Sequence, residues 1–523
     1  MSTKLGDGSF VLRSVWYYRA GRPLVRTALL GLILVLIVRA VEYLSYAARA
    51  IAFPFTLDYG EGIVWQQALL IPGSRMYGDI TQFPYIVFHY TPLYHLTVRA
   101  IAAIFGADLL AAGRSSTLAF TIAIAVLAGS IVSAAMREIL PTNARVVGGT
   151  ISGLMLLTYS PVQDWAVMMR VDMLAVGFTM TGVYLAILAG ERTIILSAAI
   201  LMFVLAVYTK QTELAAPAAA MLVATMVSVR SSLKASAFGL VVGGGFFAIL
   251  ELKTGGRFWH HIFQYNLNRF SFHVMIRNLR TQEPEALGVL LGILAFAYLW
   301  WIEATSIAAL RIRLWVDALR QSRKLRALMI ISLWFVFASA QLVSVGKWGS
   351  TTNYFIEWIC ITTLPTGMVV SLAWERATTA HKAARFAGVA GVLVSFTLAA
   401  HALHRPLAEL PIVDDPNGVA VRSQLVQLIR ENPKPSLSED MGLLLRAGQK
   451  VPIEPAIFDD LTARGIWNQQ PFLSLIQARA FGLIILQEAE DEAFTSAVAS
   501  AIRHNYPLVE RRGDYTVRRP LEP

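Results

Sequence analysis

Long apolar runs separated by short polar segments follow one another along roughly the first 400 residues of the chain. A helix needs about 20 mostly apolar residues to cross a membrane, and several of these runs reach that length. The first run is too long for the apolar part of a cleaved signal peptide, so it predicts an uncleaved anchor. The runs predict membrane-spanning helices over residues 27–50, 113–136, 145–162, 173–190, 193–209, 212–229, 235–252, 285–304, 327–345, 354–374 and 386–404.

One apolar segment, residues 93–106, is shorter than these runs and contains His95 and Arg99. At this length it favours an interfacial or re-entrant helix over a full crossing. If it crosses the membrane, every later loop changes sides. The pattern as a whole therefore predicts about 11 to 13 transmembrane helices.

After residue 404 the long apolar runs stop. Residues 405–523 contain thirteen Lys and Arg and sixteen Asp and Glu. Within them, 425–431 and 496–506 have the apolar spacing of helices, while 482–486 and 514–519 are typical of strands. The pattern predicts a small α/β domain.

The composition agrees with lipid as the main solvent, because 56% of the residues are hydrophobic and 15% are charged. A soluble domain is about a quarter charged. The net charge of +11 resides mainly in short loops, which argues against a nucleic-acid partner. The single cysteine, Cys360, excludes an internal disulfide and a cysteine-based metal site. The predicted fold class is an all-α polytopic membrane protein over residues 1–404, with a large first outer loop at 51–112, followed by a small soluble α/β domain over 405–523.

The basic residues predict the orientation of the helices. With the N-terminus inside, the cytoplasmic segments hold nineteen Lys and Arg, and the longer outer segments before the tail hold twelve. Basic residues are enriched in cytoplasmic loops. We therefore expect a multi-pass protein of the cell inner (plasma) membrane whose C-terminal domain lies on the periplasmic, or extracytoplasmic, side.

Unusual polar residues gather in the five predicted outer loops, whereas the inner loops carry mostly basic anchors. Ionisable residues at the end of a span cost about several kcal/mol when they face lipid, so they usually face a cavity. Each acid alone could instead solvate a loop end or pair with a neighbouring Arg. The residues with the strongest signal are Asp58, Glu61, Arg170, Asp172, Lys210, Gln211, Arg269, Lys347 and Asn353.

Several of these segments resemble a known superfamily. The pattern LDYGEG, GSRMYGD and YTPLYHL, then RVDMLA, YTKQT and GKWGSTTNYF, is similar to the GT-C glycosyltransferases. Within them it most resembles the branch of the protein O-mannosyltransferases and the aminoarabinose transferases (ArnT-like), and the likeness extends over about residues 50–520. The resemblance implies a glycosyltransferase of the cell envelope that takes a polyprenyl-phosphate-linked sugar and acts on the outer face. The acceptor would be a glycolipid, a polysaccharide or a protein.

Displacing a polyprenyl phosphate from a sugar requires a base for the attacking hydroxyl or amine and positive charge for the departing phosphate. The resemblance implies that Asp58 or Glu61 is the general base. Asp172 would be a second acid that orients the base, the sugar or a metal ion.

Lys210 is the main candidate for binding the donor phosphate, because a lone lysine between apolar spans is costly unless it meets an anion. A salt bridge to Glu213 is the alternative. Arg170 either pairs with Asp172 or contacts the phosphate. Lys347 and Arg269 are secondary phosphate candidates. The candidates for binding the sugar or the acceptor are Tyr59, Trp65, Tyr90, Gln211 and Asn353, although aromatic residues near a bilayer interface also occur as ordinary belt residues.

The sequence leaves metal dependence open, since acids at these spacings act with or without a divalent cation such as Mg²⁺ or Mn²⁺. His260 and His261 are adjacent and therefore point differently, so one metal site seldom uses both. The alternative function is a transporter or flippase for lipid-linked sugars. It predicts broken helices and charges at the midplane, often in a repeated arrangement, and the sequence shows no internal repeat.

Overall fold

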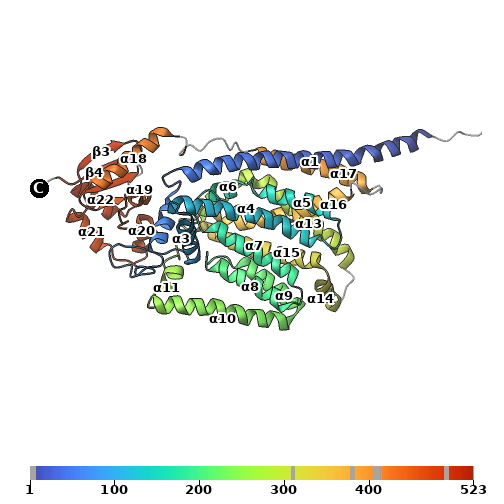
Figure 1. The fold of residues 1–523 in the computed structure, drawn as a ribbon, viewed down its shortest axis with the longest axis horizontal. Coiled ribbons are helices and arrows are strands. Elements are labelled where there is room, and N and C mark those ends of the chain that lie inside the picture. Colours follow the sequence, from blue (N-terminus) through green and yellow to red (C-terminus); the bar gives the residue numbers. More distant parts are fainter. Residues whose placement is uncertain are drawn as a thin grey trace, which may run out of the picture.

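The computed structural model describes residues 8–307, 312–376, 383–404, 413, 415–487 and 494–521. An elongated helical bundle carries a small α/β domain at one end (Figure 1). The bundle and its connections contain α1 (Gly8–Ala52), α2 (Tyr59–Leu70), α3 (Leu93–Phe105), α4 (Leu109–Ala135), α5 (Thr142–Leu156), α6 (Ser160–Trp165), α7 (Asp172–Ala189), α8 (Thr193–Val207), α9 (Ala215–Val227), α10 (Val229–Lys253), α11 (Arg257–Trp259), α12 (Phe272–Arg280), α13 (Ala286–Ile307), α14 (Ile312–Gln321), α15 (Arg323–Gln341), α16 (Ile356–Arg376) and α17 (Ala383–Leu403), with short π or 3₁₀ turns at His260–Gln264, Glu283–Glu285, Leu342–Gly346 and Thr352–Phe355.

Within the described ranges, seven helices are long and apolar enough to cross a membrane, and they lie in α1, α4, α7, α10, α13, α15 and α16. The predicted fold class is confirmed: the chain is a multi-pass membrane protein with a small α/β domain. Helices α5, α8 and α9 have 15, 15 and 13 residues and are shorter than the predicted spans. At ~1.5 Å per residue they extend about 20–23 Å, less than the ~30 Å hydrocarbon core. The polar turn between α8 and α9 is consequently buried in the bundle.

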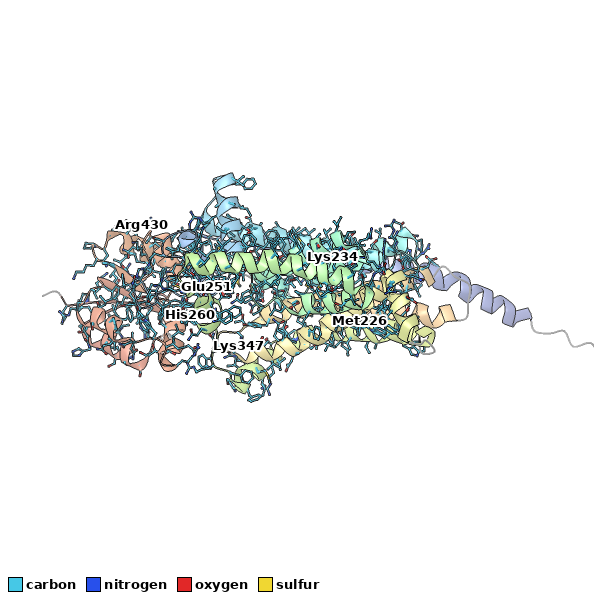
Figure 2. All side chains as sticks on the ribbon, turned by 90° about the horizontal axis from the view of Figure 1, so that it is seen from below. Met226, Lys234, Glu251, His260, Lys347 and Arg430 are labelled. Atoms are coloured by element: carbon cyan, nitrogen blue, oxygen red, sulfur yellow. The ribbon has the colours of Figure 1, made fainter. Side chains whose placement is uncertain are left out.

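The connections between helices separate into two groups at the two ends of the bundle. Those predicted on the outer side gather at the end that carries the α/β domain, and those predicted on the inner side gather at the other (Figure 1). Figure 2 shows Lys234 and Met226 toward the far end, and Arg430 and His260 toward the domain end. This separation agrees with the predicted alternation of loops.

Helix α3 does not follow the direction of the bundle. It projects sideways near the domain end (Figure 2), and Ile104 and Phe105 at its tip are each 75% exposed. Gly106, with a φ of 60°, ends the helix in a left-handed conformation that glycine adopts without strain. A short helix in this position leaves the alternation of the other loops intact.

Glycine contacts bring three helices of the bundle together. A Cβ on Gly129 of α4 would lie 2.9 Å from the carbonyl oxygen of Gly149 in α5. A Cβ on Gly367 of α16 would lie 2.7 Å from the carbonyl oxygen of Gly148. Small residues at helix contacts allow the close backbone approach by which helices associate in lipid. These contacts hold α4, α5 and α16 close together within the bundle.

The C-terminal domain is a four-stranded sheet with helices on both faces. Its strands are β1 (Ser436–Ser438), β2 (Leu483–Gln487), β3 (Leu508–Arg512) and β4 (Tyr515–Arg519), in the order β1-β2-β4-β3. Its helices are α18 (Pro416–Glu431), α19 (Met441–Arg446), α20 (Pro455–Ala463), α21 (Gln470–Gln477) and α22 (Ser496–Asn505). The pair β1–β2 is parallel, and β4 is antiparallel to both of its neighbours.

Successive residues of β2 point to opposite faces of the sheet, as the pleat requires. Ile484 and Leu486 join one apolar core with α20, α21 and α22, while Leu483 and Ile485 join another with α18 and α19. The predicted helices at α18 and α22 and the predicted strands at β2 and β4 are confirmed. The short strand β1 and helices α19 to α21 lie where the sequence gave no separate expectation.

The first long loop, after α1, packs into both of these cores. Phe53 and Phe55 join the core on the α18 side, and Ile80, Tyr85 and Val87 join the core on the α20 side. The backbone N–H of Tyr85 also donates to the carbonyl of Pro452 at 2.8 Å. The loop and the C-terminal domain therefore form one packed unit.

Candidate active site

Asp58 stands at the start of α2, in the first long loop. Its Oδ1 accepts a hydrogen bond from the backbone N–H of Glu61 at 2.9 Å and so caps the helix. Its Oδ2 lies 3.5 Å from Nη1 of Arg170, and 30% of the side chain is exposed. Burial raises the pKa of Asp58, although the Arg170 guanidinium acts to lower it. One carboxylate oxygen thus caps the helix and the other lies beside Arg170, while part of the side chain stays exposed.

Glu61, three residues later, is fully buried and saturated with donors. Both of its carboxylate oxygens accept hydrogen bonds from Arg114 of α4, at 2.9 and 2.7 Å. The backbone N–H groups of Leu57 and Met169 each donate to it at 2.6 Å. Arg114 also donates to the backbone carbonyls of Ala50, Phe53 and Phe55. The pair joins the end of α1, the first loop, α4 and the segment before α7.

Arg170 lies in the short connection between α6 and α7. Its guanidinium stacks on the ring of Trp165, with the carbon Cζ 4.5 Å from the ring centroid. It also presses against the backbone of α2, because a Cβ at Gly60 would overlap Nη1 and lie 2.5 Å from Cζ. The glycine between the two acids is therefore what allows Arg170 to approach α2.

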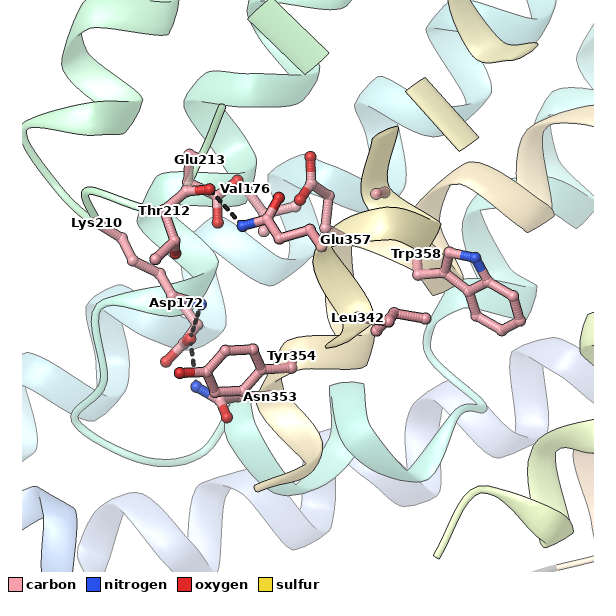
Figure 3. Close-up of a pocket in the computed structure, with 12 residues that line it drawn as sticks. Asp172, Val176, Lys210, Thr212, Glu213, Leu342, Asn353, Tyr354, Glu357 and Trp358 are labelled. Atoms are coloured by element: carbon pink, nitrogen blue, oxygen red, sulfur yellow. Dashed lines mark hydrogen bonds and ion pairs between the residues drawn. The ribbon is translucent and has the colours of Figure 1, made fainter. Parts of the chain in front are cut away.

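A second charged group lies at the N-terminus of α7. Asp172 Oδ1 accepts hydrogen bonds from Lys210 Nζ at 2.8 Å and from Asn353 Nδ2 at 2.9 Å. Figure 3 shows Asp172 and Lys210 pointing toward one another, with Tyr354 beside them. Lys210 Nζ lies 5.4 Å from the Tyr354 ring centroid. The adjoining cavity has a volume of about 20 Å³, which is room for about one water molecule.

The ion pairs of the structure differ from the two that the sequence offered, which were Lys210 with Glu213 and Arg170 with Asp172. Lys210 pairs with Asp172, while Glu213 accepts a hydrogen bond from Thr179 at 3.1 Å. Arg170 pairs with Asp58. Arg170 Nε, Asp172 Oδ2 and Gln211 Oε1 are buried without a hydrogen-bond partner. Buried polar atoms in this condition are uncommon, so this part of the molecule has unused capacity to bind a polar group.

The remaining candidates for binding the sugar or the acceptor differ in their exposure and in their hydrogen-bond partners. Tyr59 is 39% exposed, and its hydroxyl accepts a hydrogen bond from the Ala456 backbone N–H at 3.4 Å. The Tyr90 side chain is half-buried. Trp65 is buried, with Arg446 over its ring. Gln211 donates to the carbonyl of His89 at 2.8 Å.

The two secondary phosphate candidates lie apart from this network. Arg269 donates from Nε to Asp460 of α20 at 2.8 Å and stacks on Trp348. The Lys347 backbone forms an isolated antiparallel bridge with Phe270, and its half-buried side chain lies at the domain end (Figure 2). The structure therefore brings Asp58, Arg170, Asp172, Lys210 and Asn353 together and leaves Arg269 and Lys347 at the border with the C-terminal domain.

Comparison with solved structures places this arrangement in a known architecture. ArnT from Cupriavidus metallidurans bound to undecaprenyl phosphate superposes with a TM-score of 0.54 at 15% identity, covering 93% of this chain and 97% of that one. An oligosaccharyltransferase of Archaeoglobus fulgidus tethered to an acceptor peptide superposes with a TM-score of 0.50 at 11% identity, covering 90% and 72%. The fold is that of the GT-C glycosyltransferases.

The GT-C resemblance stated from the sequence is thus confirmed at the level of the fold. ArnT in the apo state gives a TM-score of 0.53 at 14% identity, with the same coverage of both chains. No protein-family model and no curated protein sequence matches the chain.

One GT-C neighbour bears on the question of a metal. The Archaeoglobus fulgidus oligosaccharyltransferase also has a structure in complex with zinc and sulfate, with a TM-score of 0.50 at 13% identity, covering 90% of this chain and 71% of that one. Among the described residues of this chain, no group of three or more His, Cys, Asp and Glu is arranged to hold a metal ion. His261 instead bridges the Phe88 N–H and the Gly78 carbonyl. The described residues therefore do not supply a ready set of metal ligands.

Three components of this candidate site were not singled out from the sequence. The sequence indicates that Arg114 needs a partner, because it is an arginine inside an apolar run. The run does not identify Glu61 as that partner. Trp165 looks like an ordinary interfacial aromatic. The ion pair between His89 and Glu454, 2.7 Å long, joins residues 365 positions apart, and no local pattern indicates it.

Proposed function

We propose that this chain transfers a sugar from a polyprenyl-phosphate donor to a hydroxyl or amine acceptor, on a glycolipid, a polysaccharide or a protein, at the outer face of the cell inner membrane. Its C-terminal domain would lie on the periplasmic side. The GT-C fold supports the reaction class, and the undecaprenyl phosphate bound to ArnT supports the donor class. The observation that carries the proposal is that Asp58, of the three predicted acids, has a partly exposed carboxylate beside a cation.

In this proposal Asp58 is the general base. It takes the proton as the acceptor oxygen or nitrogen attacks the anomeric carbon, and the bond from that carbon to the phosphate oxygen breaks with its electron pair leaving on the phosphate. A carboxylate whose pKa is raised toward the working pH is a better proton acceptor than an ordinary exposed one. Burial supplies that change at Asp58.

Arg170 and Lys210 supply the positive charge for the departing phosphate. Arg170 lies against Asp58, and Lys210 is connected to the same region through Asp172. Preorganised charges of this kind stabilise a developing anion because they need no reorientation during the reaction. Asp172 positions Lys210, and Asn353 holds Asp172 by donating to the same carboxylate oxygen. Lys347 and Arg269 lie at the border with the C-terminal domain and have no assigned step.

Glu61 has a positioning role in the proposal, because Arg114 and two backbone N–H groups occupy its carboxylate. Tyr59, Tyr90 and Gln211 are the proposed sugar contacts. We assign no step to a divalent cation, since the described residues do not form a set of ligands for one.

The test is sugar transfer from a panel of radiolabelled polyprenyl-phosphate sugars by the purified full-length chain in nanodiscs, with membrane extract as the acceptor. We expect the wild type to transfer the sugar and Asp58→Asn to lose this transfer without losing thermal stability. This result would support both the reaction class and the role of Asp58 as general base. The transporter alternative predicts a different result. In sealed vesicles it requires movement of the lipid-linked sugar across the bilayer without transfer of the sugar.

A further inference from the structure

A polar cleft opens between the start of α2 and the C-terminal domain, next to Asp58. Its volume is about 230 Å³. This is below the about 300–1,000 Å³ of pockets that take drug-sized ligands, so the cleft suits one compact group. Thr56, Asp58 and Tyr59 line it from the loop, and Arg422, Asp440 and Gln487 line it from the domain.

Hydrogen bonds fix the domain side of this cleft. Asp440 caps α19 through the N–H of Gly442 at 3.0 Å, and it accepts hydrogen bonds from Thr56 at 3.2 Å and from the hydroxyl of Tyr515 at 2.9 Å. Arg422 of α18 donates from Nε to the same Tyr515 hydroxyl at 3.0 Å. A cleft held in this way before the ligand arrives loses little conformational entropy on binding.

The charges of the cleft define what it can bind. Asp58 and Asp440 provide two carboxylates, and Arg422 provides one guanidinium. A phosphorylated group would face two like charges at close range. Sugar hydroxyls donate to carboxylates and accept from guanidinium and amide N–H groups, which Arg422 and the exposed Gln487 offer. The exposed ring of Tyr59 adds a flat apolar surface beside them.

We propose, on the basis of the function proposed above, that this cleft binds the acceptor and that the group it takes is an uncharged sugar. Donor and acceptor then approach Asp58 from opposite sides. Arg170 and Lys210 lie on the side of the donor phosphate, and the carboxylate-rich cleft lies on the side of the attacking hydroxyl. The C-terminal domain thereby selects the acceptor by charge.

The test measures binding without any donor, so that it does not depend on catalysis. The full-length protein in nanodiscs is titrated with a set of uncharged oligosaccharides and with the same compounds carrying a phosphate monoester, and binding is followed by saturation-transfer NMR. Arg422→Gln is compared with Arg430→Gln. Both arginines belong to α18, and Arg430 lies outside the cleft, where it donates to the Arg446 carbonyl (Figure 2).

We expect millimolar binding of uncharged sugars by the wild type and by Arg430→Gln, and about tenfold weaker binding by Arg422→Gln, the effect of one lost charged hydrogen bond. Asp440→Asn should improve binding of the phosphorylated compounds. Equal binding by the two arginine variants, tighter binding of the phosphorylated compounds by the wild type, or no binding of any uncharged sugar would each overturn the proposal.

The two proposals fail in different ways. If sugars bind in the cleft but no polyprenyl-phosphate sugar is turned over, the cleft proposal holds and the proposed function is wrong. If sugar is transferred and the KM for the acceptor is the same in Arg422→Gln and in the wild type, the proposed function holds and the cleft proposal is wrong.

Discussion

Asp58 and Glu61 stand three residues apart at the start of the same helix, and each faces an arginine, yet their surroundings differ in almost every physical respect. Glu61 and Arg114 are fully buried and share two hydrogen bonds. Asp58 and Arg170 meet at 3.5 Å, and Asp58 keeps part of its surface exposed beside a cleft. The first pair is closed to any substrate, and the second is open.

The difference separates structural from chemical use of the same two residue types. A buried ion pair with all its hydrogen bonds made is costly to break, because either partner alone leaves an uncompensated charge. A long, partly exposed pair is weak and can exchange its partner for a substrate. We therefore expect substitutions at Glu61 to act on stability and substitutions at Asp58 to act on the reaction.

Asp58→Asn gives the largest expected effect. Asparagine still caps α2 but cannot take a proton, so kcat for sugar transfer should fall by about 10²–10⁴, the usual contribution of a general base. Thermal stability should stay within the range of surface substitutions. Retention of more than half of the activity would remove Asp58 from the proposed mechanism.

Glu61→Gln should act on folding. It leaves Arg114 buried without a counter-charge and should lower the free energy of unfolding by about 3 kcal/mol or more, measured as a lower midpoint in thermal denaturation of the purified protein. The matched control is Glu510→Gln, on the exposed strand β3. A Glu61→Gln protein as stable as the wild type but inactive would reverse the roles of the two acids.

Gly60→Ala tests the contact between Arg170 and α2. The new methyl group occupies the position of the Arg170 guanidinium, which must move away from Asp58. We expect about a tenfold loss in kcat/KM, comparable to the loss of one charged hydrogen bond, with the fold retained because the displaced group is a flexible side-chain end. Gly245→Ala, where a Cβ meets nothing within 4 Å, should leave activity unchanged.

The pH profile gives the smallest expected effect. The reaction needs ionised Asp58, so the rate should fall as the pH drops through the raised pKa of this carboxyl. Arg170 lowers that pKa, and Arg170→Gln should therefore move the acid limb of kcat/KM to higher pH. Arg430→Gln should not move it. An acid limb at the same pH in Arg170→Gln would show that a group other than Asp58 sets it.

The parts of this molecule that the sequence predicted are those with a repeating local signal. Apolar run length predicted the membrane helices, and the short strand-like segments 482–486 and 514–519 predicted β2 and β4, because burial in lipid or in a sheet acts on neighbouring residues together. The spans predicted at 193–209 and 212–229 correspond to α8 and α9, which end at Val207 and begin at Ala215, on either side of the buried Lys210.

The site was predicted as a set of residues and not as a set of pairs. The family resemblance marked Asp58 as a candidate, and charged residues near the ends of the apolar runs marked Arg170, Asp172 and Lys210. Their partners depend on how the loops pack: the sequence offered Glu213 for Lys210 and Asp172 for Arg170, whereas the structure pairs Lys210 with Asp172 and Arg170 with Asp58. The cleft depends on Asp440, which lies 384 positions after Thr56, its hydrogen-bond partner, and no local pattern indicates that contact.

The packing of the first loop into the cores of the C-terminal domain also sets an order of events during biosynthesis. Residues such as Phe53, Ile80 and Tyr85 are synthesised early in translation, but their apolar partners are synthesised several hundred codons later. Until those partners leave the ribosome, the loop has no core to enter and the cleft has only one wall. A chain interrupted before its last hundred residues would carry its membrane helices without the second wall of the cleft, so the proposed activity would appear only after these residues are made.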